Sequence, residues 1–333
     1  MGEKVKKELS DGKNTEKTIL KRLMEFRELT IVLLIILFSV VLTMFYPGFM
    51  TVSNWRIILN GQSLIMLMAS VVTISLISGH PDLSVGSILG CGAFAATLVL
   101  EAGGNAMVAF LAGALFGGFL GLINGLAIVK LGLLPFVVTL ATQMAYQGLG
   151  LTMIGNRAVA NLPTEFKDIV QKTEPFGIPF NIFVAIIAVI IFSILLKYNR
   201  SFHEAYFIGG NKESARLAGI NVDFFVIRGY VLNGLMAGLA GVLYLSRLGG
   251  APSTIGDGMQ FDVICAMLIG GVSFSGGSGT IVGSFLGAIV MGMLTNALAF
   301  LNINTNFNRV LTGAIIIFAV FVDNLNRRRK ERA

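Results

Sequence analysis

Long apolar runs are the feature of this sequence that most constrains its fold. Several approach or exceed the roughly 20 residues that an α-helix needs to cross a bilayer, and the first reads TIVLLIILFSVVLTMFY over residues 30–46. Of the 333 residues, 55% are hydrophobic and only 13% are charged, which is outside the range of ordinary soluble domains. The runs are continuous rather than alternating, so a β-barrel is not indicated. We therefore predict an all-α polytopic membrane protein.

The apolar runs predict about ten transmembrane helices, some of them short or broken. In chain order they fall at residues 30–46, 57–78, 86–101, 106–129, 134–154, 180–196, 225–246, 261–272, 280–300 and 308–323. The third and eighth are short, and the sequence leaves open whether they cross completely. A pseudo-repeat of two halves is a further hypothesis, because GGFLG (117–121) and GSFLG (283–287) each open a glycine-rich span.

The basic residues indicate how the chain is oriented. They gather in the two tails and between spans, where positive charge marks the cytoplasmic side, and ten crossings put both tails on one side. The net charge of +7 is thus a membrane signal, and no nucleic-acid partner is expected. The expected segments are a cytoplasmic N-terminal tail (1–28), a transmembrane domain (29–324) with a cytoplasmic loop (197–222) and extracytoplasmic loops (155–179 and 247–260), and a basic cytoplasmic tail (325–333).

The N-terminal tail carries a weak helical pattern, in which Ile19, Leu20, Leu23 and Phe26 recur at helical spacing. A small amphipathic helix on the inner membrane surface fits this pattern. A solvated run that continues into the first span fits it equally well. No small-residue cleavage site follows the first apolar run, so we expect that span to remain in place.

A long polar, charged interruption between spans reads FIGGNKESARLAGINVDFF, residues 207–225. It predicts a very short helix with Asn211 as the N-cap and Gly219 at the C′ position. Glu213 in the first turn and Arg216 near the end have the order of charges that the helix dipole favours. Gly209 and Gly210 would give it a flexible entry. A two-turn helix is not stable alone in water, so it must dock on its own membrane domain or on another protein.

A second interruption, SGHPDLSVGS, follows the second span. Pro81 should end the helix there, and Asp82 and Ser84 could cap a new helix that starts near Val85. A broken helix at membrane depth is tolerated only where it is buried in protein or lines a cavity. An acidic residue in or near a span, here Asp82 or Asp262, is by default a functional hypothesis. Helix capping is the alternative, and for Asp82 it is the favoured one.

The other polar residues within the spans are mostly neutral, which suits an uncharged, hydroxyl-rich solute. Such residues also hold transmembrane helices together, and for any single one the packing role is favoured. The candidate residues of a translocation pathway are Gln62, Asp82, Ser84, Asn124, Gln143, Asn233, Asp262 and Asn296.

Several kinds of chemistry have no signature in the sequence. No GxxxxGK[ST] phosphate loop occurs, so the chain is not expected to hydrolyse ATP. Neither HExxH nor CxxC occurs, and His80 and His203 lie in separate regions without ligand-like neighbours. Cys91 and Cys265 both fall in apolar segments, so a disulfide framework is not indicated. We expect neither an enzyme nor a bound cofactor or metal.

Five stretches in order resemble one family over nearly the whole chain. They are PGFMTVSNWRIIL, PDLSVGS, GLINGLAIVKLGLLPFVVTLAT, FIGGNKESARLAGI and DVICAMLIGGVSFSGGSGTIVGSFLGAIVMGML. The chain resembles the permease subunits of bacterial ABC importers of the ribose and simple-sugar type, in the superfamily shared with branched-chain amino acid permeases. Two stretches depart from the pattern: His80 and Pro81 stand where Gly-Ile usually precedes DLSVG, and GMQFDVICA replaces the more usual GYELDAIAA.

The resemblance implies a multi-pass permease in a bacterial plasma (inner) membrane that carries a monosaccharide or similar hydroxylated solute. It implies as partners a second permease subunit, identical or related, two cytoplasmic ATPase subunits that bind ATP and Mg²⁺, and an extracytoplasmic solute-binding protein. It also implies that residues 211–219 form a coupling helix that docks on the ATPase. The residues assigned to coupling are Gly209, Gly210, Asn211, Glu213, Ala215, Arg216, Leu217 and Gly219.

Other functions stay open at this point. Within the superfamily, the solute could be a nucleoside, a polyol, a sugar-like signal molecule or a branched-chain amino acid. An ion-coupled carrier or channel is less favoured, because few ionisable groups lie deep in the spans. A membrane enzyme is disfavoured because its catalytic constellation is missing.

Overall fold

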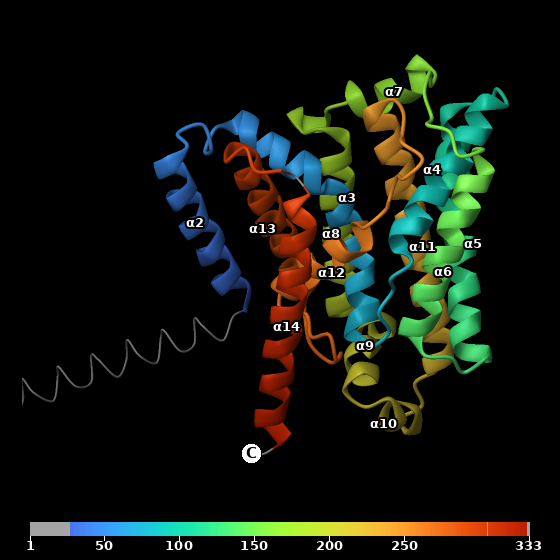
Figure 1. Cartoon of the computed structure of the whole chain (residues 1–333). Helices are drawn as coiled ribbons and strands as arrows, with labels where there is room; N and C mark the ends of the chain where they lie inside the picture. Colours follow the sequence, from blue (N-terminus) through green and yellow to red (C-terminus); the bar gives the residue numbers. More distant parts are fainter. Residues whose placement is uncertain (1–26, 305, 332–333) are drawn as a thin grey trace, which may run out of the picture.

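The structure, a computed structural model, describes residues 27–304 and 306–331, and its regular elements are helices (Figure 1). Within these residues the only β-type pairing is an isolated bridge between Val159 and Ala251. The predicted all-α class is confirmed. The amphipathic helix predicted within residues 1–28 falls almost wholly outside the described residues.

Seven helices are long and apolar enough to cross a membrane among the described residues. They are α2 (Arg27–Phe45), α3 (Val52–Ile77), α5 (Ala106–Lys130), α8 (Phe180–Tyr198), α11 (Val222–Leu248), α13 (Ile281–Phe300) and α14 (Phe307–Glu331). A multi-pass membrane protein is therefore supported, but the predicted count of ten spanning helices is not confirmed.

The three remaining predicted spans are not long and apolar enough to count as membrane-crossing helices, for different reasons. Helix α6 (Pro135–Met153) has 19 residues, but Gln143 and Gln147 lower its hydropathy. Helices α4 (Val85–Glu101) and α12 (Met259–Ile269) are apolar but have only 17 and 11 residues. At a rise of about 1.5 Å per residue, α12 is about 16 Å long, roughly half of a hydrocarbon core of about 30 Å. Helix α12 cannot cross alone, and the irregular segment 249–258 precedes it.

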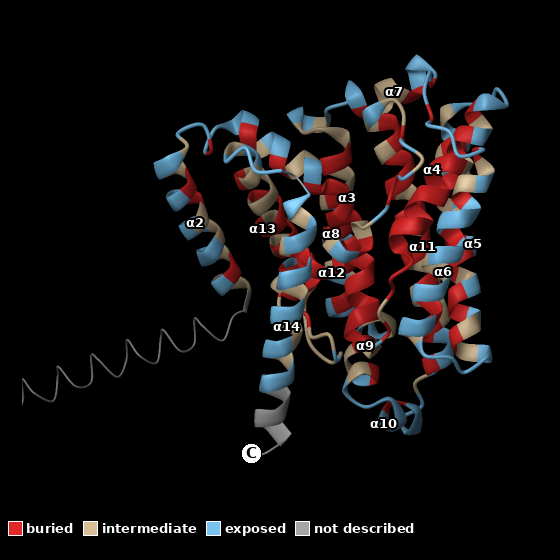
Figure 2. Cartoon of the chain, in the orientation of Figure 1, coloured by how far each residue is buried: buried red, intermediate tan, exposed pale blue. Residues whose placement is uncertain are grey.

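Helix α3 lies at the centre of the bundle. Every residue from Gln62 to Ile77 is buried (Figure 2). By contrast, α2 and α14 lie at the edge and expose apolar side chains such as Leu37 and Phe318. Exposed apolar surface of this kind suits contact with lipid or with another transmembrane subunit.

Helices α5 and α11 approach each other closely through glycines. A Cβ atom at Gly117 would collide with the carbonyl oxygen of Gly234, and one at Gly234 with that of Gly117. Gly113 and Gly238 make a similar contact one turn away. Small residues permit this backbone approach in membrane helices, where van der Waals packing supports association.

The two glycine motifs behind the repeat hypothesis pack on different partners. Gly117 and Gly121 of GGFLG contact α11, whereas Gly283 and Gly287 of GSFLG contact the end of α12 and the turn after it. Helix α5 also packs on α4, and α13 also packs on α3. The relation between the halves stays a prediction.

The short helices lie at opposite ends of the bundle (Figure 1). Helices α9 (Arg200–Gly210) and α10 (Lys212–Leu217) are at the end where α2 begins and α14 ends. Helix α7 (Thr164–Gln171) and the 3₁₀ turn η1 (Pro175–Gly177) belong to the 155–179 segment at the other end. Sequence reasoning treated both segments as loops and missed α7 and α9, since each is short and docks through a few side chains such as Phe166 and Ala205, both 0% exposed.

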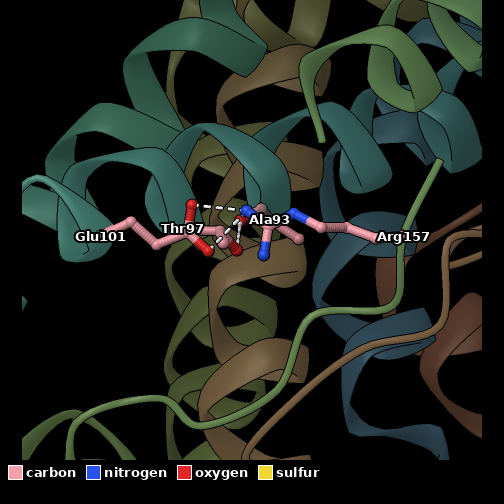
Figure 3. Close-up of polar contacts among 4 residues, drawn as sticks. All are labelled: Ala93, Thr97, Glu101 and Arg157. Carbon is pink, nitrogen blue, oxygen red and sulfur yellow. Dashed lines mark hydrogen bonds and ion pairs between the residues drawn. The ribbon is translucent and has the colours of Figure 1, made fainter. Parts of the chain in front are cut away.

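Two ion pairs, Arg157 with Glu101 and Glu174 with Arg56, fix the 155–179 segment to the bundle. Arg157 donates to both carboxylate oxygens of Glu101, at the end of α4, with N–O distances of 2.6 and 2.7 Å (Figure 3). One turn earlier, the Thr97 hydroxyl donates back to the carbonyl of Ala93 (Figure 3). The end of α4 thus lies beside the chain that leads into α7.

Candidate functional site

Four of the predicted pathway residues meet in one buried network around Asp82. One carboxylate oxygen accepts from the backbone N–H of Ser84 at 3.0 Å and from its hydroxyl at 2.6 Å. The other accepts from the Asn233 side-chain amide at 3.1 Å. Asp82 is only 1% exposed. These bonds therefore replace the hydrogen bonds that water would make to an exposed carboxylate.

The network extends through Asn124 and Tyr146. Asn124 donates to the Ser84 hydroxyl at 2.8 Å and accepts from the Tyr146 hydroxyl at 3.0 Å. On the opposite side, the Ser75 hydroxyl donates to Asn233 at 3.2 Å. Side chains from α3, α5, α6 and α11 therefore converge on the irregular segment 78–84.

This geometry favours the structural interpretation of Asp82. Its side chain fixes the irregular backbone before α4 through the Ser84 N–H, which is a local turn contact. Ser84 itself occupies the N-cap position, but its side chain makes no capping bond. The prediction that Ser84 caps α4 is therefore wrong, because its hydroxyl is already used by Asp82 and Asn124.

The other predicted pathway residues lie apart from this network. Asn296 exchanges amide hydrogen bonds with Asn54, at 2.9 and 3.1 Å, and so joins α13 to α3. Asp262 accepts from the Thr312 hydroxyl at 3.2 Å, which joins α12 to α14. Gln62 lies against Gly292, with its buried Oε1 unpaired within the described part of the chain.

Gln143 lines a small cavity of mixed polarity between α4, α6 and the segment 249–258. Each helix contributes a stripe with spacing i, i+3, i+4 and i+7, which is one helix face. The lining residues are Ser87, Gly90, Cys91 and Phe94 of α4, Gln143, Tyr146, Gln147 and Gly150 of α6, Ser253–Asp257 of the irregular segment, and Gln260 of α12. The cavity has a volume of about 20 Å³, which is room for about one water molecule.

Two amide groups in this cavity have no hydrogen-bond partner among the described residues. They are Oε1 of Gln143 and Nε2 of Gln260, and both atoms are buried. Gln260 is 1% exposed and lies against Gly86, where a Cβ atom would collide with it. Sequence reasoning selected Gln143 but missed Gln260, although GMQFDVICA was already singled out as a departure from the family pattern.

The short helix α10 forms as its local sequence predicts. The Asn211 side chain accepts from the Ser214 N–H at 2.9 Å, and Gly219 follows the helix with a φ of +83°. Arg216 pairs with Asp223 at 3.1 Å and with Glu213 at 3.6 Å. Ala215 is buried, whereas Leu217 is 90% exposed. Helix α10 therefore docks on its own chain through one side and presents an apolar side chain to solvent on another.

Gly209 has a different role from the flexible entry predicted for it. It lies inside helix α9, and a Cβ atom there would collide with the Ile77 carbonyl oxygen and the Gly277 nitrogen. The Gly277 N–H itself donates to the Ile77 carbonyl at 2.7 Å. The end of α3, the end of α9 and the turn after α12 thus meet backbone to backbone, and the chain next to α10 is packed rather than loose.

Comparisons with known proteins identify the family. Residues 56–320 match the family described as branched-chain amino acid transport system / permease component. The ribose import permease protein RbsC of Escherichia coli K12 is 34% identical over 300 residues, covering 89% of this chain and 92% of that protein. The D-allose transport system permease protein AlsC of the same strain is 34% identical over 278 residues, covering 83% and 85%.

A third relative covers still more of the chain. The autoinducer 2 import system permease protein LsrC of Escherichia coli SMS-3-5 is 31% identical over 316 residues, covering 94% of this chain and 92% of that protein. No solved structure matches the chain. With a family match over most of its length and relatives aligned nearly end to end, the chain belongs to the permease component family of ABC import systems.

Proposed function

We propose that this protein is the transmembrane permease subunit of an ATP-driven importer for a monosaccharide. The choice of a monosaccharide as the solute rests on the near full-length similarity to permeases named for ribose and D-allose. The cavity between α4 and α6 supports it, since its lining includes several uncharged hydroxyl and amide groups and Asp257 is the one ionisable carboxyl there. A zwitterionic amino acid would call for charged partners of both signs.

The proposed assembly places a different partner at each end of the bundle. A cytoplasmic ATPase, which would bind ATP and Mg²⁺, contacts α10, and the chain termini lie on the same, cytoplasmic side. A solute-binding protein approaches the opposite end, near α7. A second permease subunit, identical or related, completes the pathway in a bacterial inner membrane. The permease itself hydrolyses nothing in this scheme.

Leu217 supports the coupling role of α10. It is the 90% exposed apolar residue at the end of a short, capped helix. Burying a leucine side chain against a partner contributes about 1.5–3 kcal/mol. Arg216 is less informative as a test, because it pairs within the chain with Glu213 and Asp223.

The coupling role is tested with Leu217→Asp. We expect ATPase co-purification and uptake to fall at least about tenfold, while the amount of permease in the membrane stays unchanged. Phe176→Asp, at a 93% exposed apolar residue of the opposite end, is the matched control for co-purification and should leave it intact. Unchanged co-purification in Leu217→Asp would contradict a docking role for α10.

The solute class is tested by uptake in proteoliposomes that hold the permease, its ATPase and its solute-binding protein. Radiolabelled D-ribose, D-allose and D-galactose are supplied separately. We expect ATP-dependent uptake of at least one of them. The similarity to LsrC makes autoinducer 2 the second candidate, and uptake of that compound alone would replace the monosaccharide proposal.

A further inference from the structure

The two unpaired amides of the cavity between α4, α6 and residues 249–258 call for a ligand. Gln260 Nε2 is a donor and Gln143 Oε1 is an acceptor, and both are buried without a partner in the described chain. Buried polar groups in proteins are hydrogen-bonded, and leaving them unpaired costs free energy. Among the described residues, the neighbouring Asp82 network has no buried unpaired side-chain atom, whereas two such atoms lie in this one cavity. Gln62, Ser193 and Arg247 each hold a single buried unpaired atom elsewhere in the bundle.

The chemistry of the two atoms defines what the ligand must do. The ligand must accept a hydrogen bond from Gln260 and donate one to Gln143. A water molecule does both, and the cavity volume of about 20 Å³ holds about one. An alcohol hydroxyl group also does both, whereas a carboxylate only accepts and an ammonium only donates.

The surroundings of the cavity provide an entrance. Its wall runs from buried Gln260 and Cys91 to Thr254 and Asp257, which are exposed. The cavity also extends along α4 and α6 to Gly150, near the end of α6 that leads toward α7. The irregular segment that closes it is fixed by the backbone bridge between Val159 and Ala251 and by an ion pair between Asp257 and Arg309 at 3.4 Å.

We propose that Gln143 and Gln260 form a hydroxyl-binding site on the solute pathway, in the half of the bundle that faces α7. This proposal rests on the proposed import function. At rest the site holds water. When α6 and residues 253–257 separate during the transport cycle, a hydroxyl group of the sugar replaces the water, accepts from Gln260 Nε2 and donates to Gln143 Oε1.

The first test uses the reconstituted transporter with the wild-type permease or with Gln143→Ala or Gln260→Ala. At saturating sugar-loaded binding protein, we expect each variant to lower the maximal uptake about tenfold. Sugar-stimulated ATP hydrolysis should stay within about twofold of wild type, because α10 is untouched. Ser193→Ala is the control: its Oγ is also buried without a partner among the described residues but lies outside this cavity, and its loss should leave uptake unchanged.

The outcomes separate this proposal from the function it rests on. If the wild type takes up none of the sugars D-ribose, D-allose and D-galactose, the proposed function fails. If it takes up one of them and both cavity variants match it, only the hydroxyl site fails. If the variants lose uptake, ATP hydrolysis and thermal stability together, the amides are structural and the proposal is also overturned.

The second test leaves both amides in place and uses Cys91, which lines the cavity and is 1% exposed. In a Cys265→Ala background, we expect methyl methanethiosulfonate to modify Cys91 at least about fivefold faster during turnover with ATP and sugar-loaded binding protein than at rest. Cys265, buried beside Thr312, should stay unreactive in a Cys91→Ala background. Equal rates for Cys91 in both conditions would mean that the cavity never opens and would overturn the proposal.

Discussion

Two polar clusters lie side by side in this bundle: the network around Asp82 and the cavity that holds Gln143 and Gln260. They differ in whether their buried polar atoms have hydrogen-bond partners. Around Asp82, Ser84 and Asn233 donate hydrogen bonds to both carboxylate oxygens, and Ser75, Asn124 and Tyr146 extend the network. In the cavity, Gln143 and Gln260 each keep a buried amide atom unpaired. Tyr146 belongs to both, since its hydroxyl donates to Asn124 while the residue lines the cavity.

The difference separates groups that hold the fold from groups that can bind a solute. A closed network leaves no hydrogen-bonding capacity for a passing molecule, and its loss leaves other buried groups unpaired. Open amides contribute little to the fold and retain that capacity. The comparison predicts that changes in the first cluster alter stability and that changes in the second alter transport.

The largest expected effect on stability is that of Asp82→Ala. It would leave the Ser84 N–H, the Ser84 hydroxyl and one Asn233 amide hydrogen without this acceptor. At about 1–3 kcal/mol for each buried group left unpaired, we expect a loss of at least about 3 kcal/mol. Thermal unfolding in detergent and the amount of protein in the membrane measure it. Wild-type stability in this variant would contradict the conclusion that the Asp82 network stabilises the fold.

Tyr146→Phe tests the residue that the two clusters share. It removes the hydroxyl, whose single hydrogen is shared between Asn124 Oδ1 and the Leu120 carbonyl, both at 3.0 Å, and it keeps the ring beside the cavity. We expect a loss of about 1 kcal/mol in unfolding free energy and uptake within about twofold of wild type. A loss of uptake without a loss of stability would assign the hydroxyl to the solute.

Gln62→Met tests an unpaired amide outside the cavity. Gln62 Oε1 is buried against Gly292 without a partner in the described chain, and methionine has a similar shape. We expect stability to stay unchanged or to rise by up to about 1 kcal/mol, as measured by the thermal midpoint. Uptake by this variant tests the predicted pathway role of Gln62. A strong decrease in uptake without a loss of stability would show that the solute path includes α3.

Arg157→Ala has the smallest expected effect. Its ion pair with Glu101 has side chains that are 52% and 40% exposed, and exposed pairs contribute about 0–1 kcal/mol. We expect a decrease of about 0.5 kcal/mol in stability that disappears at high salt. A decrease as large as that of Asp82→Ala would mean that exposure is a poor guide to which polar contacts hold this fold.

The sequence predicted the helices well where the signal is local. Run length located most spans to within a few residues, and the caps of α10 are where Asn211 and Gly219 place them. It failed at Gly209, which looked flexible but lies in a helix packed on Ile77 and Gly277. That contact joins segments far apart in the chain, so no local pattern encodes it.

The candidate site shows the same division. The sequence by itself determined that the chain crosses a membrane, that its intramembrane polar groups are mostly neutral amides and hydroxyls, and that α10 is a capped helix, because length, hydropathy and capping act over a few neighbouring residues. Only the tertiary structure decided that Asp82 is paired and that Gln143 and Gln260 share a cavity. Hydrogen bonding between helices depends on how the helices pack. The same type of polar side chain is therefore structural where packing gives it a hydrogen-bond partner, and available to a solute where packing gives it none.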